Sequence, residues 1–167
     1  SWTARDSGTS TSLFGISCGY NHFVAVGGSG KILISSDGTS WTEVASGTIE
    51  PLRAVTYGHN LFVAIGGGYL QPEVDSYTIL TSEDGLNWKT VSSGFSYPLI
   101  GVTHNNNIFV AVNGRDTIFT SSDGINWTAK DLETDDFLYG ITYGNTTFVA
   151  VGGFYDFFSD SFKGSAL

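Results

Sequence analysis

The tetrapeptide FVAV at residues 23–26 returns as FVAI at 62–65 and again as FVAV at 109–112 and 148–151. The starts of these four segments are 39, 47 and 39 residues apart. The four tryptophans of the chain, Trp2, Trp41, Trp88 and Trp127, keep the same three spacings. Two independent markers in one register indicate that a single unit of about 40 residues is repeated along the chain.

Each unit predicts four short strands, here named A to D in chain order. In the first unit they cover residues 13–19, 22–27, 31–36 and 40–46, which are rich in β-branched and aromatic residues and bounded by turn-forming residues. No segment combines a helical apolar period with helix caps. The predicted fold class is therefore all-β, a β-propeller of four four-stranded antiparallel blades.

The unit boundaries predict one domain over residues 1–167, with repeats at about 8–46, 47–93, 94–132 and 133–167 plus 1–7. The last unit has no fourth strand, and SWTARDS at 1–7 is a fourth strand with no strands before it. We expect this N-terminal strand to complete the last blade and so to remove an open sheet edge. Two further arrangements stay open: a homodimer that forms an eight-blade ring, and a piece of a larger propeller.

Composition excludes several classes of protein. The 167 residues are 41% hydrophobic and 14% charged, which is typical of a globular domain. A net charge of −9 and the lack of a Lys/Arg cluster argue against a nucleic-acid partner. No apolar run approaches the roughly 20 residues of a membrane-spanning helix, so no membrane insertion is expected.

Cysteine usage and the chain ends say less. The single cysteine, Cys18, is expected to be a packed strand residue. The chain has no initiator Met and no visible signal peptide, so we expect a mature product or an excised piece. Its acidic, Lys-poor composition, rich in Ser, Thr and Asn, favours an extracellular or cell-surface location.

A short motif recurs before the D strand of three units: SSDGTSW at 35–41, SEDGLNW at 82–88 and SSDGINW at 121–127. The Asp is expected to accept hydrogen bonds from backbone N–H groups of the turn, and the Gly to supply a positive φ. Ser36, Ser82 and Ser122 are expected to add a bond to the backbone, and the Trp to cover the turn. This chemistry is structural, so the motif predicts a scaffold element and not a ligand site.

These three segments resemble the Asp-box (BNR-type) repeat of β-propellers, Ser-x-Asp-x-Gly-x-x-Trp. That family includes sialidases, other glycan-active proteins and photosystem-assembly propellers. Here the Gly follows the Asp directly, one residue earlier than in the usual box. The resemblance implies a propeller whose boxes lie on turns away from the active face, and it implies little about the ligand.

A binding site is expected where the units differ, on the face formed by the D–A and B–C loops. The B–C loop of the second unit, within residues 66–77, carries the insertion that lengthens one spacing. Exposed loops of this kind carry function more often than the elements they join, although a tolerated insertion is the alternative. The candidate ligand-binding residues are Tyr69, Gln71, Glu73, Asp75 and Tyr77 of this loop, Arg115 and Tyr155 of the later B–C loops, and Arg53 of an A strand.

Arg53 occupies a position that differs in every unit. The residue after the leading Leu of strand A is Phe14, Arg53, Ile100 or Tyr139, and the A strand is the innermost of a blade. Arg53 is expected to bind a carboxylate of a ligand or, alternatively, to pair with Glu50 or another acidic residue of the chain.

Acidic residues on the same face suggest a Ca²⁺ site, with a solvated surface as the alternative. The candidate ligands are Asp116, Asp135, Asp136 and Asp156. No other cofactor and no catalytic residue is expected.

The predicted function is a non-catalytic binding or scaffold β-propeller that recognises a glycan or a protein partner. One alternative is a sialidase-like glycoside hydrolase. Such a site needs three converging arginines, whereas Arg5, Arg53 and Arg115 lie on different elements. The other alternative is a purely structural or assembly domain of a larger surface protein.

Overall fold

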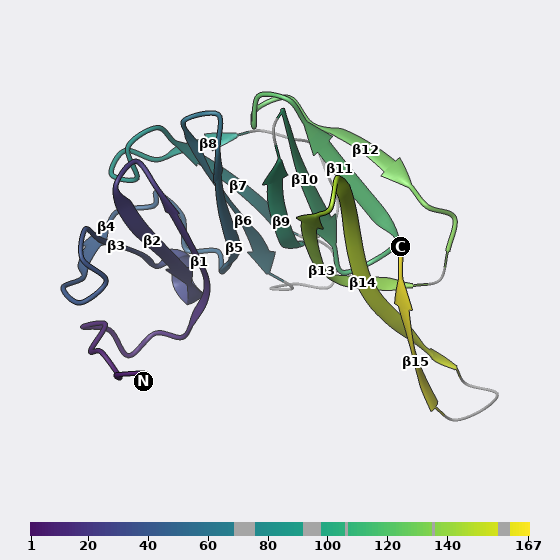
Figure 1. Cartoon of the computed structure of the whole chain (residues 1–167), viewed down its shortest axis with the longest axis horizontal. Helices are drawn as coiled ribbons and strands as arrows, with labels where there is room; N and C mark the ends of the chain where they lie inside the picture. Colours follow the sequence, from purple (N-terminus) through teal and green to yellow (C-terminus); the bar gives the residue numbers. More distant parts are fainter. Residues whose placement is uncertain (69–75, 92–97, 106, 135, 157–160) are drawn as a thin grey trace.

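The computed structural model describes all residues except 69–75, 92–97, 106, 135 and 157–160, and the described chain is all-β (Figure 1). It holds four antiparallel sheets and one short 3₁₀ turn at Gly28–Gly30. The first sheet contains β1 (Leu13–Gly19), β2 (His22–Gly27), β3 (Ile32–Ser35) and β4 (Thr42–Val44). The others contain β5 (Leu52–Gly58), β6 (Leu61–Gly68), β7 (Ser76–Ser82) and β8 (Lys89–Val91); β9 (Leu99–Asn105), β10 (Ile108–Asn113), β11 (Thr117–Ser121) and β12 (Thr128–Asp131); and β13 (Phe137–Gly144), β14 (Thr147–Asp156) and β15 (Ser161–Ala166).

Each predicted repeat forms one sheet. Strands pair with their neighbours in sequence, and the four FVAV or FVAI segments form the middle of the second strands β2, β6, β10 and β14. Alternate residues of such a segment point to opposite faces of its sheet. This arrangement explains why the whole segment is apolar, because both faces of an inner sheet are covered.

The sheets stack face to face through a junction that recurs along the chain. β1 lies against β5, β5 against β9 and β9 against β13 (Figure 1). In the first junction Val24 and Val26 pack with Phe62 and Ala64 of the next sheet. The later junctions repeat this pairing, with Val63 and Ile65 against Phe109 and Ala111, and with Val112 against Ala150. Each sheet therefore offers a valine face to the following sheet and a phenylalanine face to the preceding one.

The fourth sheet differs from the prediction of four strands in every blade. It contains three strands, β13, β14 and β15, and residues 1–12 form no strand. The expectation that residues 1–7 complete the last sheet is therefore wrong for this structure. The physical reason is distance. The N-terminal segment lies beside the first sheet, and the fourth sheet lies at the other end of the row of four sheets (Figure 1).

In the part of the chain that the structure describes, no helix has the length and apolar character needed to cross a membrane.

Candidate functional site

A β-bulge interrupts the first strand of every sheet at the same place. The pairing of β1 with β2 skips a residue between Leu13 and Gly15, and β5 skips one between Leu52 and Ala54. β9 and β13 repeat the irregularity, so the four extra residues are Phe14, Arg53, Ile100 and Tyr139. A bulge leaves its extra residue unpaired and re-aims the side chain, and bulges are common beside binding sites. These four positions, the bulge residues, are the ones that differ between units in the sequence.

Glycines on the neighbouring strand make room for the bulges. A Cβ on Gly27, Gly66 or Gly152 would lie within 2.2 Å of a backbone carbonyl oxygen that precedes the bulge. The third sheet has Asn113 at this position, and Asn113 is 1% exposed. Close backbone packing therefore fixes the position of the bulges. The side chains of the four bulge residues lie together at one end of the sheets as a result.

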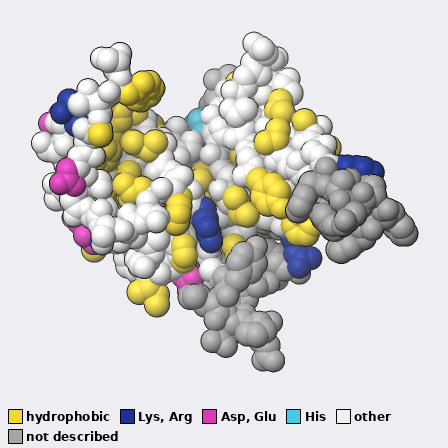
Figure 2. All heavy atoms as spheres, turned by 90° about the horizontal axis from the view of Figure 1, so that it is seen from below, with side chains coloured by type: hydrophobic (Ala, Val, Ile, Leu, Met, Phe, Trp, Pro, Cys, Tyr) yellow, Lys and Arg dark blue, Asp and Glu magenta, His cyan; other side chains and the backbone are white. Residues whose placement is uncertain are grey.

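This end of the sheets carries the D–A and B–C loops. The second strands finish here, and Figure 2 views the molecule from this side. Apolar side chains gather around basic ones on this surface (Figure 2). Phe14 and Tyr139 are 48% and 59% exposed, and Arg53 and Ile100 are half-buried. The face therefore presents aromatic and apolar surface together with a guanidinium group.

Arg53 makes a cation–π contact and does not pair with Glu50. Its Cζ lies 5.4 Å from the centre of the Phe14 ring. Among the described residues, the one salt bridge joins Lys31 and Glu43, at 2.6 Å. A guanidinium group has its N–H donors in its plane, where a planar acceptor such as a carboxylate can bind them.

Among the described residues, Glu50 Oε2 and Asn113 Nδ2 are buried polar atoms of this face that have no hydrogen-bond partner. Glu50 Oε2 is buried and lines a cavity of about 590 Å³ between the β2–β3 and β4–β5 connections. Asn113 accepts hydrogen bonds at Oδ1 from the N–H groups of Arg115 (3.1 Å) and Thr117 (3.2 Å), but its buried Nδ2 donates to nothing. Buried polar groups are normally satisfied, so these two atoms offer an acceptor and a donor to a ligand. Sequence reasoning missed both roles, although Asn113 departs from the glycine of the other units.

The predicted loop residues are placed only in part. Tyr69, Gln71, Glu73 and Asp75 lie outside the described residues, as does the side chain of Tyr155. Tyr77 is half-buried on β7. Arg115 is exposed between β10 and β11, and its carbonyl accepts a 3.1 Å hydrogen bond from the N–H of Leu138. Arg115 thus lies on the same face as the bulge residues.

The candidate metal ligands do not form a cluster in the described part of the chain. No group of three His, Cys, Asp or Glu side chains there is arranged to hold a metal ion. The Asp116 carboxylate accepts a 3.4 Å hydrogen bond from the Thr117 hydroxyl, and the N–H of Asp136 donates to Thr134 Oγ1. Asp135 and the side chain of Asp156 lie outside the described residues. The Ca²⁺ site therefore stays a prediction.

The three aspartate turns are held by internal hydrogen bonds, as predicted. Asp84 Oδ1 accepts hydrogen bonds from the N–H groups of Leu86 and Asn87, both at 2.8 Å, and Asp37 and Asp123 do the same in their turns. Gly85 has a φ of +76°, and its carbonyl accepts a 2.9 Å hydrogen bond from the Trp88 indole. The backbone N–H groups, first that of Asn87, hold the pKa of Asp84 well below its usual range.

The serine of each turn lies two residues before the Asp, which corrects the prediction for two turns. Ser35 and Ser121 donate to the Asp and accept from the Gly N–H, whereas the predicted Ser36 and Ser122 are exposed. Ser82 has the predicted role. The strand period explains this difference, because only every second residue points back into the turn.

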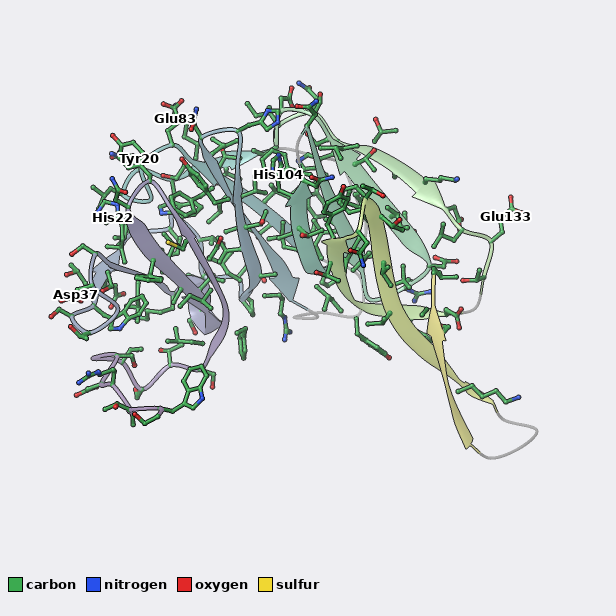
Figure 3. The ribbon with its side chains drawn as sticks, in the orientation of Figure 1. Tyr20, His22, Asp37, Glu83, His104 and Glu133 are labelled. Carbon is green, nitrogen blue, oxygen red and sulfur yellow. The ribbon has the colours of Figure 1, made fainter. Side chains whose placement is uncertain are left out.

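The opposite end of the sheets carries histidines. His22 and His104 lie there with Tyr20 and Glu83 (Figure 3). The rings of His59 and His104 meet edge to face, with 4.9 Å between their centres, and His104 also packs on Phe109 at 4.5 Å. Burial, and then the neighbouring His59, lower the pKa of His104.

This lowered pKa predicts acid-sensitive stability. The folded chain favours neutral His104. The contribution of His104 to stability is therefore fully present above the usual histidine pKa of 6.5, and it is lost as the pH falls through the lower pKa of the folded state. We expect His104→Tyr, which introduces the residue found at the equivalent positions 57 and 143, to lose less stability than wild type between pH 7.5 and 5. Urea unfolding at both pH values measures this loss. An equal loss in both proteins would contradict the prediction.

Cys18 is exposed, which contradicts the expectation of a packed strand residue. Its equivalents Tyr57 and His104 each pack over a glycine of the preceding sheet, Gly19 and Gly58. Cys18 belongs to the first sheet and has no preceding sheet to cover it.

Comparison with known proteins shows the fold but no family. No protein-family model matches the chain, and no curated protein matches it. The computationally designed Ika4 protein matches at 13% identity and a TM-score of 0.60 over 98% of both chains. A β-propeller domain of Cps50 (Swd1) from Myceliophteria thermophila matches at 8% identity and a TM-score of 0.58, over 91% of this chain and 55% of its own.

YCF48 bound to a D1 peptide matches at 17% identity and a TM-score of 0.59, over 94% of this chain and 53% of its own. The chain thus spans about half the length of these two natural structures. The likenesses show an all-β, propeller-type arrangement of sheets.

Proposed function

We propose that this chain is a non-catalytic β-propeller module of Asp-box type that recognises a protein partner at the bulge residues. The observation that carries the proposal is the set of four aligned bulges, which aims four different side chains at one end of the sheets. Aromatic and arginine side chains are the usual anchors of protein interfaces. The bulge residues supply two aromatic rings, an arginine and an isoleucine.

The chemistry of this face favours a ligand that carries a carboxylate next to apolar side chains. Arg53 offers paired N–H donors to a carboxylate, and Phe14, which contacts Arg53, offers apolar surface next to it. Tyr139 adds a ring with a polar tip. Such a ligand is an acidic or C-terminal peptide segment of a partner protein.

Two matched structures support a protein partner. YCF48 was solved with a D1 peptide, and a nidogen–laminin complex also matches this chain. Solved structures of glycoside hydrolases match it as well. Sialidase-type chemistry is not proposed for this chain, because Arg5, Arg53 and Arg115 come from the N-terminal segment, β5 and the β10–β11 connection.

A displayed peptide library selected on the wild-type chain tests the proposal. We expect enriched peptides to carry an acidic residue or a free C-terminus next to apolar residues. Arg53→Gln is expected to weaken their binding by about tenfold or more in fluorescence anisotropy, since charge-assisted bidentate hydrogen bonds are lost. The charge-matched control Lys130→Gln, on the exposed strand β12, is expected to bind like wild type.

Three results would overturn the proposal. One is no peptide enrichment together with glycan-array binding that requires Arg53, which would assign a glycan ligand. Another is turnover of fluorogenic glycosides, which would assign an enzyme. The third is an equal weakening of peptide binding by Arg53→Gln and Lys130→Gln, which would show that the effect comes from net charge and not from the position of Arg53.

The loop residues extend this proposal to the rim of the face. We assign rim contacts to Tyr69, Gln71, Glu73, Asp75, Tyr77, Arg115 and Tyr155, and we place the protein outside the cell or on its surface.

A further inference from the structure

The fourth sheet leaves its valine face open. Val24, Val63 and Val110 occupy equivalent positions and are 0%, 0% and 4% exposed, whereas Val149 is 38% exposed. At the next position of this face, Val26, Ile65 and Val112 are fully buried, and Val151 is 48% exposed. Two branched apolar side chains that are covered in three units are therefore uncovered in the last.

The first sheet leaves its phenylalanine face open in the same way. Phe62 and Phe109 are fully buried, but the equivalent Phe23 is 36% exposed and Ile16 on the same face is 60% exposed. The glycines at the ends of the first strands show the same difference. Aromatic rings of the following unit cover Gly19 and Gly58, whereas a Cβ on Gly144, in the last unit, would meet no atom within 4 Å. These two end faces are the two halves of a junction that the chain makes three times internally.

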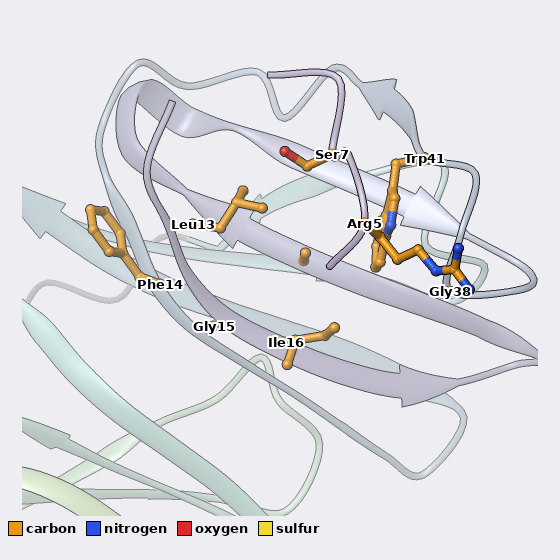
Figure 4. A pocket seen from close by; sticks show the side chains of 9 residues that line it. Arg5, Ser7, Leu13, Phe14, Gly15, Ile16, Gly38 and Trp41 are labelled. Carbon is orange, nitrogen blue, oxygen red and sulfur yellow. The ribbon is translucent and has the colours of Figure 1, made fainter. Parts of the chain in front are cut away.

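The missing strand of the fourth sheet lies at the N-terminus. Trp2 has the spacing of the other tryptophans, so residues 1–7 have the register of a D strand. In the structure Trp2 is fully exposed, and the segment carrying Arg5 and Ser7 crosses the outer face of the first sheet (Figure 4). It lines there a cavity of about 420 Å³ with Ile16 and Trp41. Residues 1–7, an unpaired strand sequence, thus lie beside the end face of the first sheet. The fourth sheet, which lacks a strand, carries the other end face.

We propose that two copies of this chain close into one ring of eight sheets. The valine face of each fourth sheet packs on the phenylalanine face of the partner copy's first sheet, and residues 1–7 of each copy add the missing strand to the partner's fourth sheet. A two-fold axis relates the two junctions, as in most homodimers. Closure would also cover the open edge of β15, and open edges promote aggregation.

Two observations favour a second copy over closure of one chain on itself. The two end faces lie at opposite ends of the row of sheets (Figure 1). The chain also covers 53% and 55% of two propeller-type structures, so two copies supply the length of one such ring.

Mass in solution gives the first test. Light scattering is expected to give twice the 17.8 kDa mass of the chain. The double variant Val149→Glu/Val151→Glu is expected to be monomeric, because buried carboxylates without partners oppose packing. Leu86→Glu/Ile125→Glu places the same two charges on exposed apolar residues away from both end faces and is expected to stay dimeric. Circular dichroism checks that each variant is folded.

Mixing two variants tests the direction of the junction. Ile16→Glu blocks the first sheet and Val149→Glu/Val151→Glu blocks the fourth, so each is expected to be monomeric alone. Their mixture retains one intact junction and is expected to give a dimer. The only cysteine, Cys18, reports burial at the same junction: its reaction with a thiol reagent is expected to slow by about tenfold or more in the dimer.

A designed disulfide separates pairing within one chain from pairing between copies. By the register of the third sheet, in which Thr117 pairs with Asp131, Asp6 would lie beside Ser165 of the partner. In a Cys18→Ser background, Asp6→Cys/Ser165→Cys is expected to run as a covalent dimer without reductant. A covalently closed monomer, a ladder of higher oligomers, or a wild-type monomer with an unprotected Cys18 would each overturn the proposal.

Discussion

Replacement of Phe109 by alanine is expected to destabilise the fold by about 3–5 kcal/mol, as for other fully buried aromatic residues. Phe109 is 0% exposed and lies in the junction between the second and third sheets. Its ring is 4.5 Å from that of His104 and 6.5 Å from that of Trp127. Alanine would leave a cavity between two sheets whose backbones are fixed by their own hydrogen bonds, so the junction has little freedom to collapse.

Urea unfolding followed by tryptophan emission measures this loss. Ile125→Ala is the control, because it also truncates a large apolar side chain but one that is 54% exposed. The control is expected to change the free energy of unfolding by less than about 0.5 kcal/mol. A loss below about 1 kcal/mol for Phe109→Ala would contradict the view that the junctions between sheets stabilise the fold.

Gly66→Ala is expected to be nearly as damaging, at roughly 3 kcal/mol, because overpacking here cannot be relieved by a side-chain movement. The new Cβ would lie 1.9 Å from the carbonyl oxygen of Pro51 and 2.8 Å from the Cα of Leu52. Both atoms belong to the backbone, next to the bulge that carries Arg53. The variant is therefore also expected to displace Arg53 and to weaken binding of the selected peptides.

Gly164→Ala provides the matched control for this change. Gly164 is also a strand glycine, on β15, and its Cβ would meet nothing closer than the Gly152 oxygen at 3.9 Å. Thermal unfolding is expected to leave this control close to wild type and to lower the midpoint of Gly66→Ala by several degrees. Equal midpoints in the two variants would show that the backbone at Gly66 moves aside freely.

The repeat made most of the fold predictable from the sequence. Because FVAV and Trp share one register, they predicted four units and their strand order, and the structure confirms one antiparallel sheet for each unit. The aspartate turns were also predictable, because their hydrogen bonds are local: those of Asp37 extend no further along the chain than Ser40. Local chemistry of this kind is written within a few adjacent residues.

Features that depend on distant parts of the chain were harder to predict. Residues 1–7 have the sequence of a strand, but whether they pair depends on where β15 lies relative to the N-terminus. Cys18 was expected to be packed, because nothing in its local sequence shows that its sheet has no predecessor. The serine prediction failed for a local reason, the strand period, and only where two serines are adjacent, at 35–36 and 121–122.

The site was predictable in part. Comparison of the four units identified Phe14, Arg53, Ile100 and Tyr139 as variable positions, and the structure shows that each is a bulge residue. The contact of Arg53 with Phe14 was not predicted, because the stacking of two sheets sets that distance. The unpartnered atoms of Glu50 and Asn113 depend on burial, which the sequence of a loop does not reveal.

The pairing of each strand with its neighbour in sequence has a consequence for how the chain folds. Because each strand pairs with a neighbour in sequence, a sheet can assemble from hairpins before any contact with the rest of the chain exists. The aspartate turns help, because their hydrogen bonds need only residues already adjacent. We expect the sheets to order early and independently, and the rate-limiting barrier to lie in docking one sheet onto the next.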